Sequence, residues 1–447
     1  MVTIKNPLTI VKTGGGPTPP TPPTPTPLDP EEVYAEKRPA NWLKMPTPAD
    51  DEYFLLLDVG DNLVDTLPVA VQVSNSPDWT LELGTTDVQG VFTADPDLVA
   101  TGTGTKTISV PANKWQDVGS TRQLMARVKI NTFSSASAIA EIAFNQGYMP
   151  LSVFKNYLVE LSGRSSGRSR TTGFPNYRRL MFFSLAGELP AGTSFSQMFY
   201  NCTSLTAIPE LDTSSGTNFS QMFSGCTSLT AIPELDTSSG TNFSSMFSGC
   251  YSLTAIPELD TSSGTSFSSM FYYCTSLTAI PELDTSSGTN FSSMFYNCYS
   301  LTAIPELDTS SGINFSQMFY NCISLTAADL TGYDFSAVTS TTALSSVLNT
   351  INGTNLTIDF GDTFGTNGIR NTGAIISGVQ NTSADYPCKV RINKTDAMLQ
   401  IAANATTLFS GTYVYVYVPD GLLATYQADT YWATLGTRLK PMSEWSA

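Results

Sequence analysis

The feature that most constrains the fold is a 24-residue repeat between residues 195 and 327. In the second copy, Met222, Phe223 and Cys226 follow Phe219 at i+3, i+4 and i+7, which is the spacing of one face of a two-turn helix. Asn218 comes directly before this segment and is its predicted N-cap. Each of the six copies opens on the same residue type: Phe195, Phe219, Phe243, Phe267, Phe291 and Phe315.

The remainder of each copy predicts a short strand and a turn. Leu229, Ile232 and Leu235 recur at every third residue, which indicates a short strand that enters a corner, and the segment from Asp236 to Gly240 consists of turn residues. Neither a two-turn helix nor a short strand can bury its apolar side alone, so the copies must stack and cover one another. The repeat therefore predicts a solenoid.

The residues that the copies share also carry a family resemblance. The pattern Met-Phe-x-x-Cys-x-x-Leu-x-x-Ile-Pro-x-Leu-Asp-Thr-Ser resembles the BspA-type leucine-rich repeats of bacterial surface proteins. The tail, from Tyr417 to Tyr426 followed by Trp432, looks like the strand-then-helix segment that closes many such arrays. This resemblance implies a leucine-rich-repeat fold and a role in binding at surfaces, without naming a ligand.

The residues before the repeats predict a spacer, a short helix and a sheet. Pro17 to Pro27 alternates proline with threonine, which predicts a stiff polyproline II stalk. Asp29 and the Pro-Glu-Glu that follows it have the N-cap, the proline and the acidic first turn of a short helix that runs to about Arg38. Period-two runs come next and predict an antiparallel β-sandwich: Tyr53 to Val59, Pro68 to Val73, Trp79 to Gly84, Thr105 to Val110, Gln123 to Ile130 and Ala138 to Phe144.

The predicted fold class is α+β, with a leucine-rich-repeat solenoid preceded by a small antiparallel β-sandwich and a Pro-rich stalk. The repeat period breaks after Asp329, where Ser340 to Ile351 predicts a longer helical copy and Asn355 to Phe360 and Tyr413 to Val418 predict strands. We expect six segments: an N-terminal anchor (1–16), a Pro/Thr-rich linker with a short helix (17–52), the β-sandwich (53–149), an N-terminal cap (150–194), the leucine-rich repeats (195–335) and the C-terminal repeats with their cap (336–447).

The first residues bear on where the protein acts. Residues 1–12 have neither the basic leader nor the long apolar core of a secretory signal. They predict a short strand that pairs with another protein, or else a frayed tail. This opening, the Pro/Thr linker and the segment from Arg38 to Pro46 look similar to the N-terminal regions of phage and prophage-encoded proteins of gut bacteria that carry BspA-type repeats. The similarity implies attachment to a virion protein through the N-terminal segment.

Charge and hydropathy exclude several classes of partner. The formal net charge is -16, and no lysine or arginine lies between Arg179 and Arg370. An acidic array of this kind repels nucleic acid and anionic membrane, so we expect neither as a partner. No apolar run approaches the length of a membrane-spanning helix, so we expect no membrane insertion.

The chain has no histidine, which excludes His-based metal sites and both Ser-His-Asp and Cys-His catalysis. Six of its seven cysteines occupy one repeat position, where they form either disulfides between coils or a ladder of small buried thiols. We favour the thiol ladder, because evenly spaced positions give no reason to pair two by two. These cysteines are Cys202, Cys226, Cys250, Cys274, Cys298 and Cys322. We expect no catalytic residue, no metal site and no cofactor.

Paired carboxylates recur in the Glu-Leu-Asp segments, for example at Glu258 and Asp260. General acid–base catalysis needs two carboxylates in different environments, whereas these pairs repeat a single environment. Two interpretations stay open. The stacked carboxylates either bind calcium between them or form a solvated acidic stripe.

Three positions beside each repeat cysteine vary between otherwise similar copies. Their residues are mostly Tyr, Ser, Asn, Gly and Thr, which are typical of binding surfaces, and neutral drift on an exposed face is the alternative. Tyrosine beside small polar residues suits sugar rings, which have apolar faces and polar rims. The candidate ligand-binding residues are Tyr200, Asn201, Tyr251, Tyr272, Tyr273, Tyr296, Asn297, Tyr299, Tyr320 and Asn321.

These features lead us to expect a non-enzymatic adhesion or receptor-binding protein of a phage particle, in a tail or head fibre at the virion surface. It would present the solenoid to a bacterial surface glycan or protein. The alternative is a BspA-type adhesin on the bacterial cell surface or secreted from it. A carbohydrate-degrading enzyme is disfavoured, because the chain has no histidine and no acidic pair that breaks the repeat. Homo-oligomer formation is left open.

Overall fold

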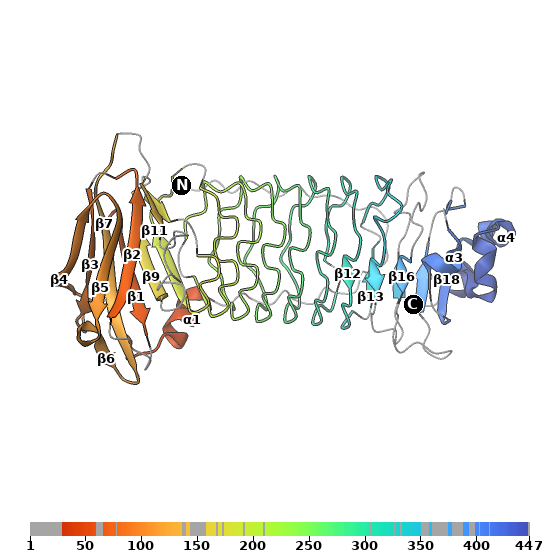
Figure 1. Cartoon of the computed structure of the whole chain (residues 1–447). Coiled ribbons are helices and arrows are strands. Elements are labelled where there is room, and N and C mark those ends of the chain that lie inside the picture. Colours follow the sequence, from red (N-terminus) through yellow and green to blue (C-terminus); the bar gives the residue numbers. More distant parts are fainter. Residues whose placement is uncertain are drawn as a thin grey trace, which may run out of the picture.

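The computed structural model describes residues 29–445 except 60–65, 77, 136–139, 144–157, 167–168, 172–173, 191–192, 209–210, 304, 326, 331–332, 350–356, 360–373, 378–387, 393–397, 402 and 411. The molecule is a rod with a β-sandwich at one end, a solenoid in the middle and small helices at the other end (Figure 1). The predicted solenoid preceded by a β-sandwich is confirmed. The predicted anchor (1–16) and the polyproline stalk lie outside the described residues.

The short helix predicted before the sandwich is α1, Pro30–Lys37. The side chain of Asp29 accepts a hydrogen bond from the backbone N–H of Glu31 and caps the helix, as the sequence predicts. Val33 is buried and packs in a small apolar cluster with Ala207 and Ala231. The helix therefore lies against the first two coils of the solenoid, next to the sandwich (Figure 1).

Among the described residues, the sandwich has a seven-stranded sheet in the order β11-β9-β1-β7-β3-β4, with β6 paired to β7, and a four-stranded sheet in the order β10-β8-β2-β5. In its described residues, each of the six predicted runs overlaps a strand. The bounds are β1 Glu52–Asp58, β2 Thr66–Ser74, β3 Asp78–Thr86, β4 Phe92–Gly102, β5 Gly104–Pro111, β6 Gln116–Val118, β7 Thr121–Thr132, β8 Ala140–Ala143, β9 Leu158–Arg164, β10 Ser169–Thr171 and β11 Phe182–Ala186, with a 3-10 turn at Ala112–Lys114.

The sandwich sheet continues directly into the solenoid. Strand β9 pairs antiparallel with β1 and parallel with β11, and Phe182 of β11 forms a parallel bridge with Ala207 of the first coil. Both strands fall within the predicted cap of residues 150–194, which we expected to be separate from the sandwich. One apolar core also runs from the sandwich through the repeats, so the two parts are continuous.

The helix predicted in each repeat is wrong. The segment that begins at Phe219 is a series of turns, and the third residue of each such segment has a left-handed backbone, for example Gln221 (φ 57°) and Ser245 (φ 57°). A left-handed residue cannot continue a right-handed helix. Asn218 accepts a hydrogen bond from the backbone of Ser220, so it stabilises a turn instead of capping a helix. The strand predicted between Leu229 and Leu235 is also absent from these described residues.

Backbone hydrogen bonds alternate within and between coils. The N–H groups of Phe219, Gln221 and Phe223 donate to carbonyls of the next coil at 3.0, 2.9 and 2.9 Å. The N–H groups of Met222 and Ser224 donate back to carbonyls three residues earlier in their own coil. Each coil therefore satisfies its backbone partly through its neighbour, which couples the coils into one stack.

Phenylalanine ladders and a thiol ladder fill the solenoid. The rings of the opening phenylalanines stack along the axis at centroid distances of 5.3–5.7 Å, and those of Phe199 and its equivalents stack at 5.4–5.7 Å. All seven cysteines are free and buried, so the thiol interpretation is confirmed. The Cys226 thiol donates to the carbonyl of Phe199 in the preceding coil at 3.1 Å, and burial raises its pKa well above the usual value.

Parallel sheets and short helices close the far end. The helix predicted from Ser340 to Ile351 is wrong, because its described residues form turns and strand β14. The strands predicted at residues 355–360 and 413–418 correspond to β15 and β18. The bounds are β12 Phe319–Tyr320, β13 Ala327–Asp329, β14 Leu348–Asn349, β15 Thr357–Asp359, β16 Ile376–Ser377, β17 Cys388–Arg391, α3 Ala405–Leu408, β18 Val414–Val418, α4 Leu423–Ala428 and β19 Leu439–Pro441, with 3-10 turns at Asp420–Leu422, Trp432–Arg438 and Met442–Glu444.

Candidate functional site

The variable positions beside the repeat cysteines form three columns along the solenoid. Column one contains Tyr200, Ser224, Ser248, Tyr272, Tyr296 and Tyr320, column two contains Asn201, Gly225, Gly249, Tyr273, Asn297 and Asn321, and column three contains Thr203, Thr227, Tyr251, Thr275, Tyr299 and Ile323. Backbone hydrogen bonds between coils fix their register. The N–H of Gly249, for example, donates to the carbonyl of Tyr272 at 2.7 Å.

Column one brings three of the predicted tyrosines together. Tyr272 and Tyr296 are stacked with centroids 4.8 Å apart and an interplanar angle of 22°, and Tyr296 and Tyr320 are stacked at 4.5 Å and 4°. All three are half-buried. Partial burial, followed by the charge of neighbouring tyrosines, raises the pKa of Tyr272 and Tyr296, so both hydroxyls are protonated at neutral pH. We call these three residues the tyrosine row.

Column two has a structural explanation that the sequence analysis missed. Every residue in it has a left-handed backbone, including Asn201 (φ 56°) and Gly225 (φ 77°), and glycine and asparagine tolerate this conformation best. Much of the variation at this position is therefore a backbone requirement. Asn297, one of the candidate ligand-binding residues, is only 4% exposed and so does not present its side chain to solvent as a ligand-binding residue must; it accepts a hydrogen bond from Asn321 at 2.7 Å.

The other predicted residues do not join the tyrosine row. Tyr200 stands three coils before Tyr272, with two serine-bearing coils between them. Asn201 donates to the side chain of Asn176 at 3.2 Å, outside the repeats. In column three, Tyr251 is 47% exposed and Tyr299 is half-buried, with Thr275 in the coil between them.

The acidic stripe has a local structural role. The Asp236 carboxylate accepts hydrogen bonds from the backbone N–H and the hydroxyl of Ser238, at 3.1 and 2.7 Å, and Asp260 does the same with Ser262. These contacts hold the turn of each coil. Within the described part of the chain, no three His, Cys, Asp or Glu residues converge into a group that could hold a metal ion.

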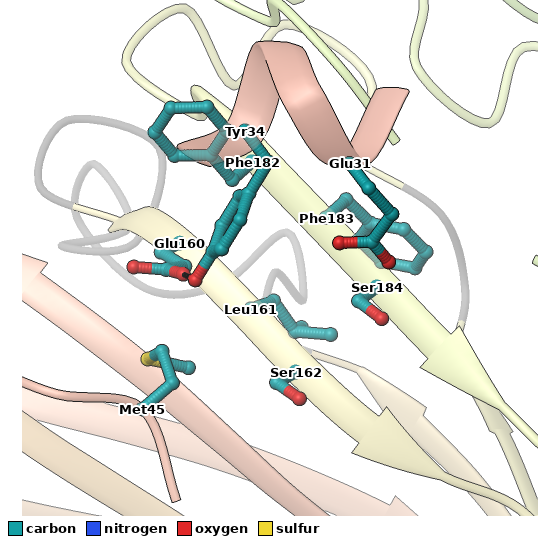
Figure 2. A pocket seen from close by; sticks show the side chains of 9 residues that line it. All are labelled: Glu31, Tyr34, Met45, Glu160, Leu161, Ser162, Phe182, Phe183 and Ser184. Carbon is teal, nitrogen blue, oxygen red and sulfur yellow. Dashed lines mark hydrogen bonds between the residues drawn. The ribbon is translucent and has the colours of Figure 1, made fainter. Parts of the chain in front are cut away.

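A cavity of about 140 Å³ lies where α1 meets β9 and β11, and Figure 2 shows Tyr34 reaching across it from α1 to Glu160 on β9. Tyr34 donates to Glu160 at 2.6 Å, and Arg38 forms an ion pair with the same carboxylate at 2.9 Å. Burial raises the pKa of the Glu160 carboxyl, while Arg38 and Tyr34 act in the opposite direction. Burial also raises the pKa of Tyr34.

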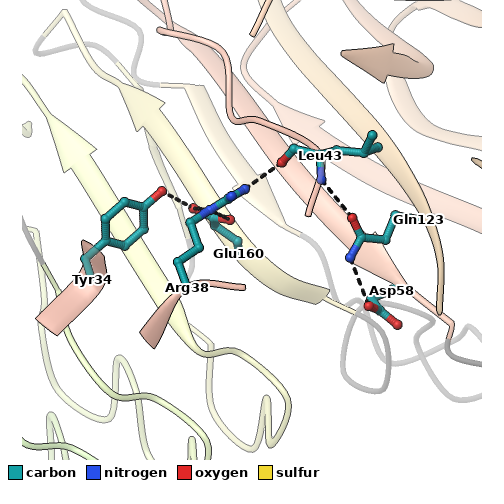
Figure 3. A network of polar contacts seen from close by, with 6 residues as sticks. All are labelled: Tyr34, Arg38, Leu43, Asp58, Gln123 and Glu160. Carbon is teal, nitrogen blue, oxygen red and sulfur yellow. Dashed lines mark hydrogen bonds and ion pairs between the residues drawn. The ribbon is translucent and has the colours of Figure 1, made fainter. Parts of the chain in front are cut away.

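The contacts around Glu160 continue into the sandwich (Figure 3). Arg38 also donates to the carbonyl of Leu43, whose N–H donates to Gln123 at 2.9 Å, and Gln123 in turn donates to Asp58 at 3.0 Å. Tyr34 lies on α1 and Arg38 directly follows it, while the other partners belong to residues 43–160, in or beside the sandwich. We therefore interpret this cluster as a clamp that holds α1 in place, and we place no catalytic role on it.

Comparisons with known proteins show what the repeats are similar to. Residues 193–303 and 277–355 match the family model described as "Mycoplasma protein of unknown function, DUF285", and together they cover about a third of the chain. A search of curated proteins found no significant match. A leucine-rich repeat protein from Bacteroides ovatus, solved by crystallography, aligns with 13% sequence identity over 70% of this chain and 97% of its own length, with a TM-score of 0.20.

None of the described helices has the length and apolar content needed to span a membrane. The family match falls on the coils that carry the phenylalanine ladders and the tyrosine row. The central part of the chain is a solenoid of repeats that resembles BspA-like leucine-rich repeats, and over residues 193–355 it is similar to the DUF285 family.

Proposed function

We propose that the chain is a non-enzymatic adhesion or receptor-binding protein of a phage particle, in a tail or head fibre, and that it presents its solenoid to a bacterial surface ligand. The observation that carries this proposal is the tyrosine row. Three stacked rings stand on successive coils, at a position where the second and third coils carry serine. Half-buried tyrosines with fixed orientations give contact area at low entropic cost, which favours a binding surface.

The rod-like shape supports a role in presentation. The sandwich sheet runs into the first coil, and the clamp around Glu160 fixes α1 beside that junction. The predicted stalk comes directly before α1, so its last residue would be held at one defined point of the rod. In this proposal, residues 1–16 bind a virion protein, the tyrosine row binds a bacterial surface glycan or protein, and the protein is located at the virion surface.

A BspA-type adhesin on the bacterial cell surface, or secreted from it, is the second candidate. It is favoured by the match of the repeats to a family described from Mycoplasma, a bacterium. It shares the tyrosine row as its binding surface but requires no virion partner. The two candidates therefore differ in where the protein is found and agree on what the solenoid does.

The location of the protein tests the proposal. Particles induced from a strain that carries the gene would be purified and examined by mass spectrometry and by immuno-electron microscopy with antibodies against the solenoid. We expect the chain in the particles, with label at the end of a fibre. Label on intact cells of a strain that releases no particles would contradict the phage assignment and support the cell-surface adhesin.

A further inference from the structure

We propose that the open face of the Tyr272 ring is a stacking site for one pyranose ring of a neutral surface glycan. This inference rests on the proposed function and names its ligand class and its point of contact. It depends on which ring faces in column one are covered, on the backbone of Tyr273 and on the charge around the site.

Stacking within the tyrosine row covers most of the aromatic faces. Tyr296 lies between Tyr272 and Tyr320, with ring centroids 4.8 and 4.5 Å away, so both of its faces are in contact with other rings. A sugar ring cannot reach those faces. Tyr296 therefore offers a ligand only its edge and its hydroxyl.

Tyr272 is the first ring of the row, and the preceding coil, whose Gly249 N–H donates to the Tyr272 carbonyl at 2.7 Å, has small residues at the neighbouring positions. Ser248 holds the same column position in that coil, and Gly249 follows it. Among the described residues, the rings that contact Tyr272 are those of Tyr273 and Tyr296. The column therefore changes abruptly from serine to a stacked aromatic ring, and we call this place the step.

Tyr273 closes one side of the step. Its ring centroid lies 4.7 Å from that of Tyr272 and 5.9 Å from that of Tyr296, which places it beside the stack instead of on the open face. Its backbone is left-handed (φ 60°), where the other copies have asparagine or glycine. This conformation is unfavourable for a large side chain, and such strained residues cluster at ligand sites.

The acidic charge of the repeats favours a neutral glycan over an anionic one as the ligand. The array has no lysine or arginine that could pair with a uronate, a sialate or a phosphate, and its carboxylates repel such groups. An aromatic face bordered by hydroxyls matches a pyranose, whose C–H face packs on the ring while its rim forms hydrogen bonds. Ser248 and Tyr273, the residues next to Tyr272 at the step, both carry hydroxyl groups, and Tyr251, 47% exposed, lies in the same coil as Ser248.

Filling the step is the sharpest test. The substitution Ser248→Tyr places a ring against Tyr272, as already occurs between Tyr272 and Tyr296, so we expect the full-length chain to fold normally. Binding of the unmodified chain and the variant would be measured with dextran, yeast mannan, laminarin and a galactan as neutral probes, and with polygalacturonate as the anionic probe. We expect the chain to bind at least one neutral probe, and the variant to bind it about tenfold more weakly or worse.

Two further variants serve as controls. Ser224→Tyr adds the same ring one coil farther away and leaves Ser248 in place, so it should preserve binding. Tyr273→Asn introduces the residue found at this position in the first, fifth and sixth coils. It should raise the melting temperature and weaken binding, and it keeps the inference testable if Ser248→Tyr folds poorly. A Ser248→Tyr variant that folds and binds as well as the unmodified chain would overturn the inference.

Attachment to cells separates this inference from the proposed function. Bacterial cells would be used intact, after periodate oxidation of their glycans and after protease treatment. We expect periodate to abolish attachment and protease to leave it unchanged. Attachment lost only after protease treatment, or a preference for polygalacturonate, would overturn the neutral-glycan inference while the adhesion proposal stands. A chain that attached to no bacterial cell would instead contradict the proposed function itself.

Discussion

Replacing Phe247 with alanine is expected to reduce the free energy of unfolding by about 3–5 kcal/mol. The ring is fully buried and stacks on Phe223 at 5.6 Å and on Phe271 at 5.7 Å. Its removal leaves a cavity with rings on both sides. Backbone bonds to the next coil, such as that from the Phe247 N–H to the Met270 carbonyl at 2.9 Å, resist collapse of the coils into that cavity. Chemical denaturation of the purified variant measures the loss.

Tyr251→Ala in the same coil is the matched control. The Tyr251 side chain is 47% exposed, so its removal should change the unfolding free energy by no more than about 0.5 kcal/mol. If Phe247→Ala cost less than about 1 kcal/mol, the ladder would not be the source of stability that the packing indicates.

Replacing Arg38 with methionine is expected to cost about 3–5 kcal/mol, because it leaves the Glu160 carboxylate buried without its cationic partner. The side chains of Glu160 and Arg38 are 3% and 14% exposed, so solvent screens this pair little. The exposed pair of Arg122 and Asp117 is the matched control, and Arg122→Ala should cost under about 1 kcal/mol.

The pH dependence and a second mutation test the cause of that loss. The pKa of Glu160 is raised in the folded protein, so the stability linked to this group is present below its ordinary value of 4.5 and is lost as pH rises through the folded value. Removing Arg38 raises the pKa of Glu160 in the folded protein further. The loss of unfolding free energy in Arg38→Met should therefore be larger at about pH 8 than at about pH 5. Adding Glu160→Gln should restore most of the lost stability. A loss that is independent of pH and is not rescued would mean that Arg38 acts by packing alone.

The stacking of repeats could be predicted, whereas the local backbone could not. The spacing of Phe219, Met222, Phe223 and Cys226 identifies the buried residues correctly. The side chains that would face inward from a helix are the ones that are buried in the observed turns. Periodicity does not report the sign of φ, so the left-handed Gln221 went unnoticed. Glycine and asparagine recurring in column two were the available signal for a left-handed residue, and we interpreted them as surface variation.

The sandwich was partly predictable for a similar reason. Strands with alternating burial, such as β3, were found, but β4 contains Asp95, Pro96 and Asp97 and gives no strand pattern. It is an edge strand, where proline is tolerated because fewer backbone donors need partners. The pairing of β9 with β1 joins segments about a hundred residues apart, which composition and spacing do not encode.

The candidate site shows the same limit. The sequence identified Tyr272, Tyr296 and Tyr320 as members of one column, and the structure stacks them. Ring orientation decides which faces remain open, and it follows from side-chain packing between coils. Burial of Asn297 likewise depends on its neighbours, since its equivalent Asn321 is half-buried.

The central claim is that the solenoid binds its ligand through the tyrosine row and the adjacent Tyr273. The most direct test measures the attachment of two sets of variants to bacterial cells. The first set replaces Tyr272, Tyr273 and Tyr296 together with serine, and the second replaces Glu258, Asp260, Glu282 and Asp284 with glutamine and asparagine. We predict that the tyrosine set abolishes attachment while the protein stays folded, and that the acidic set attaches like the unmodified chain. Loss of attachment in the acidic set alone would contradict this account and place the binding surface on the carboxylate stripe.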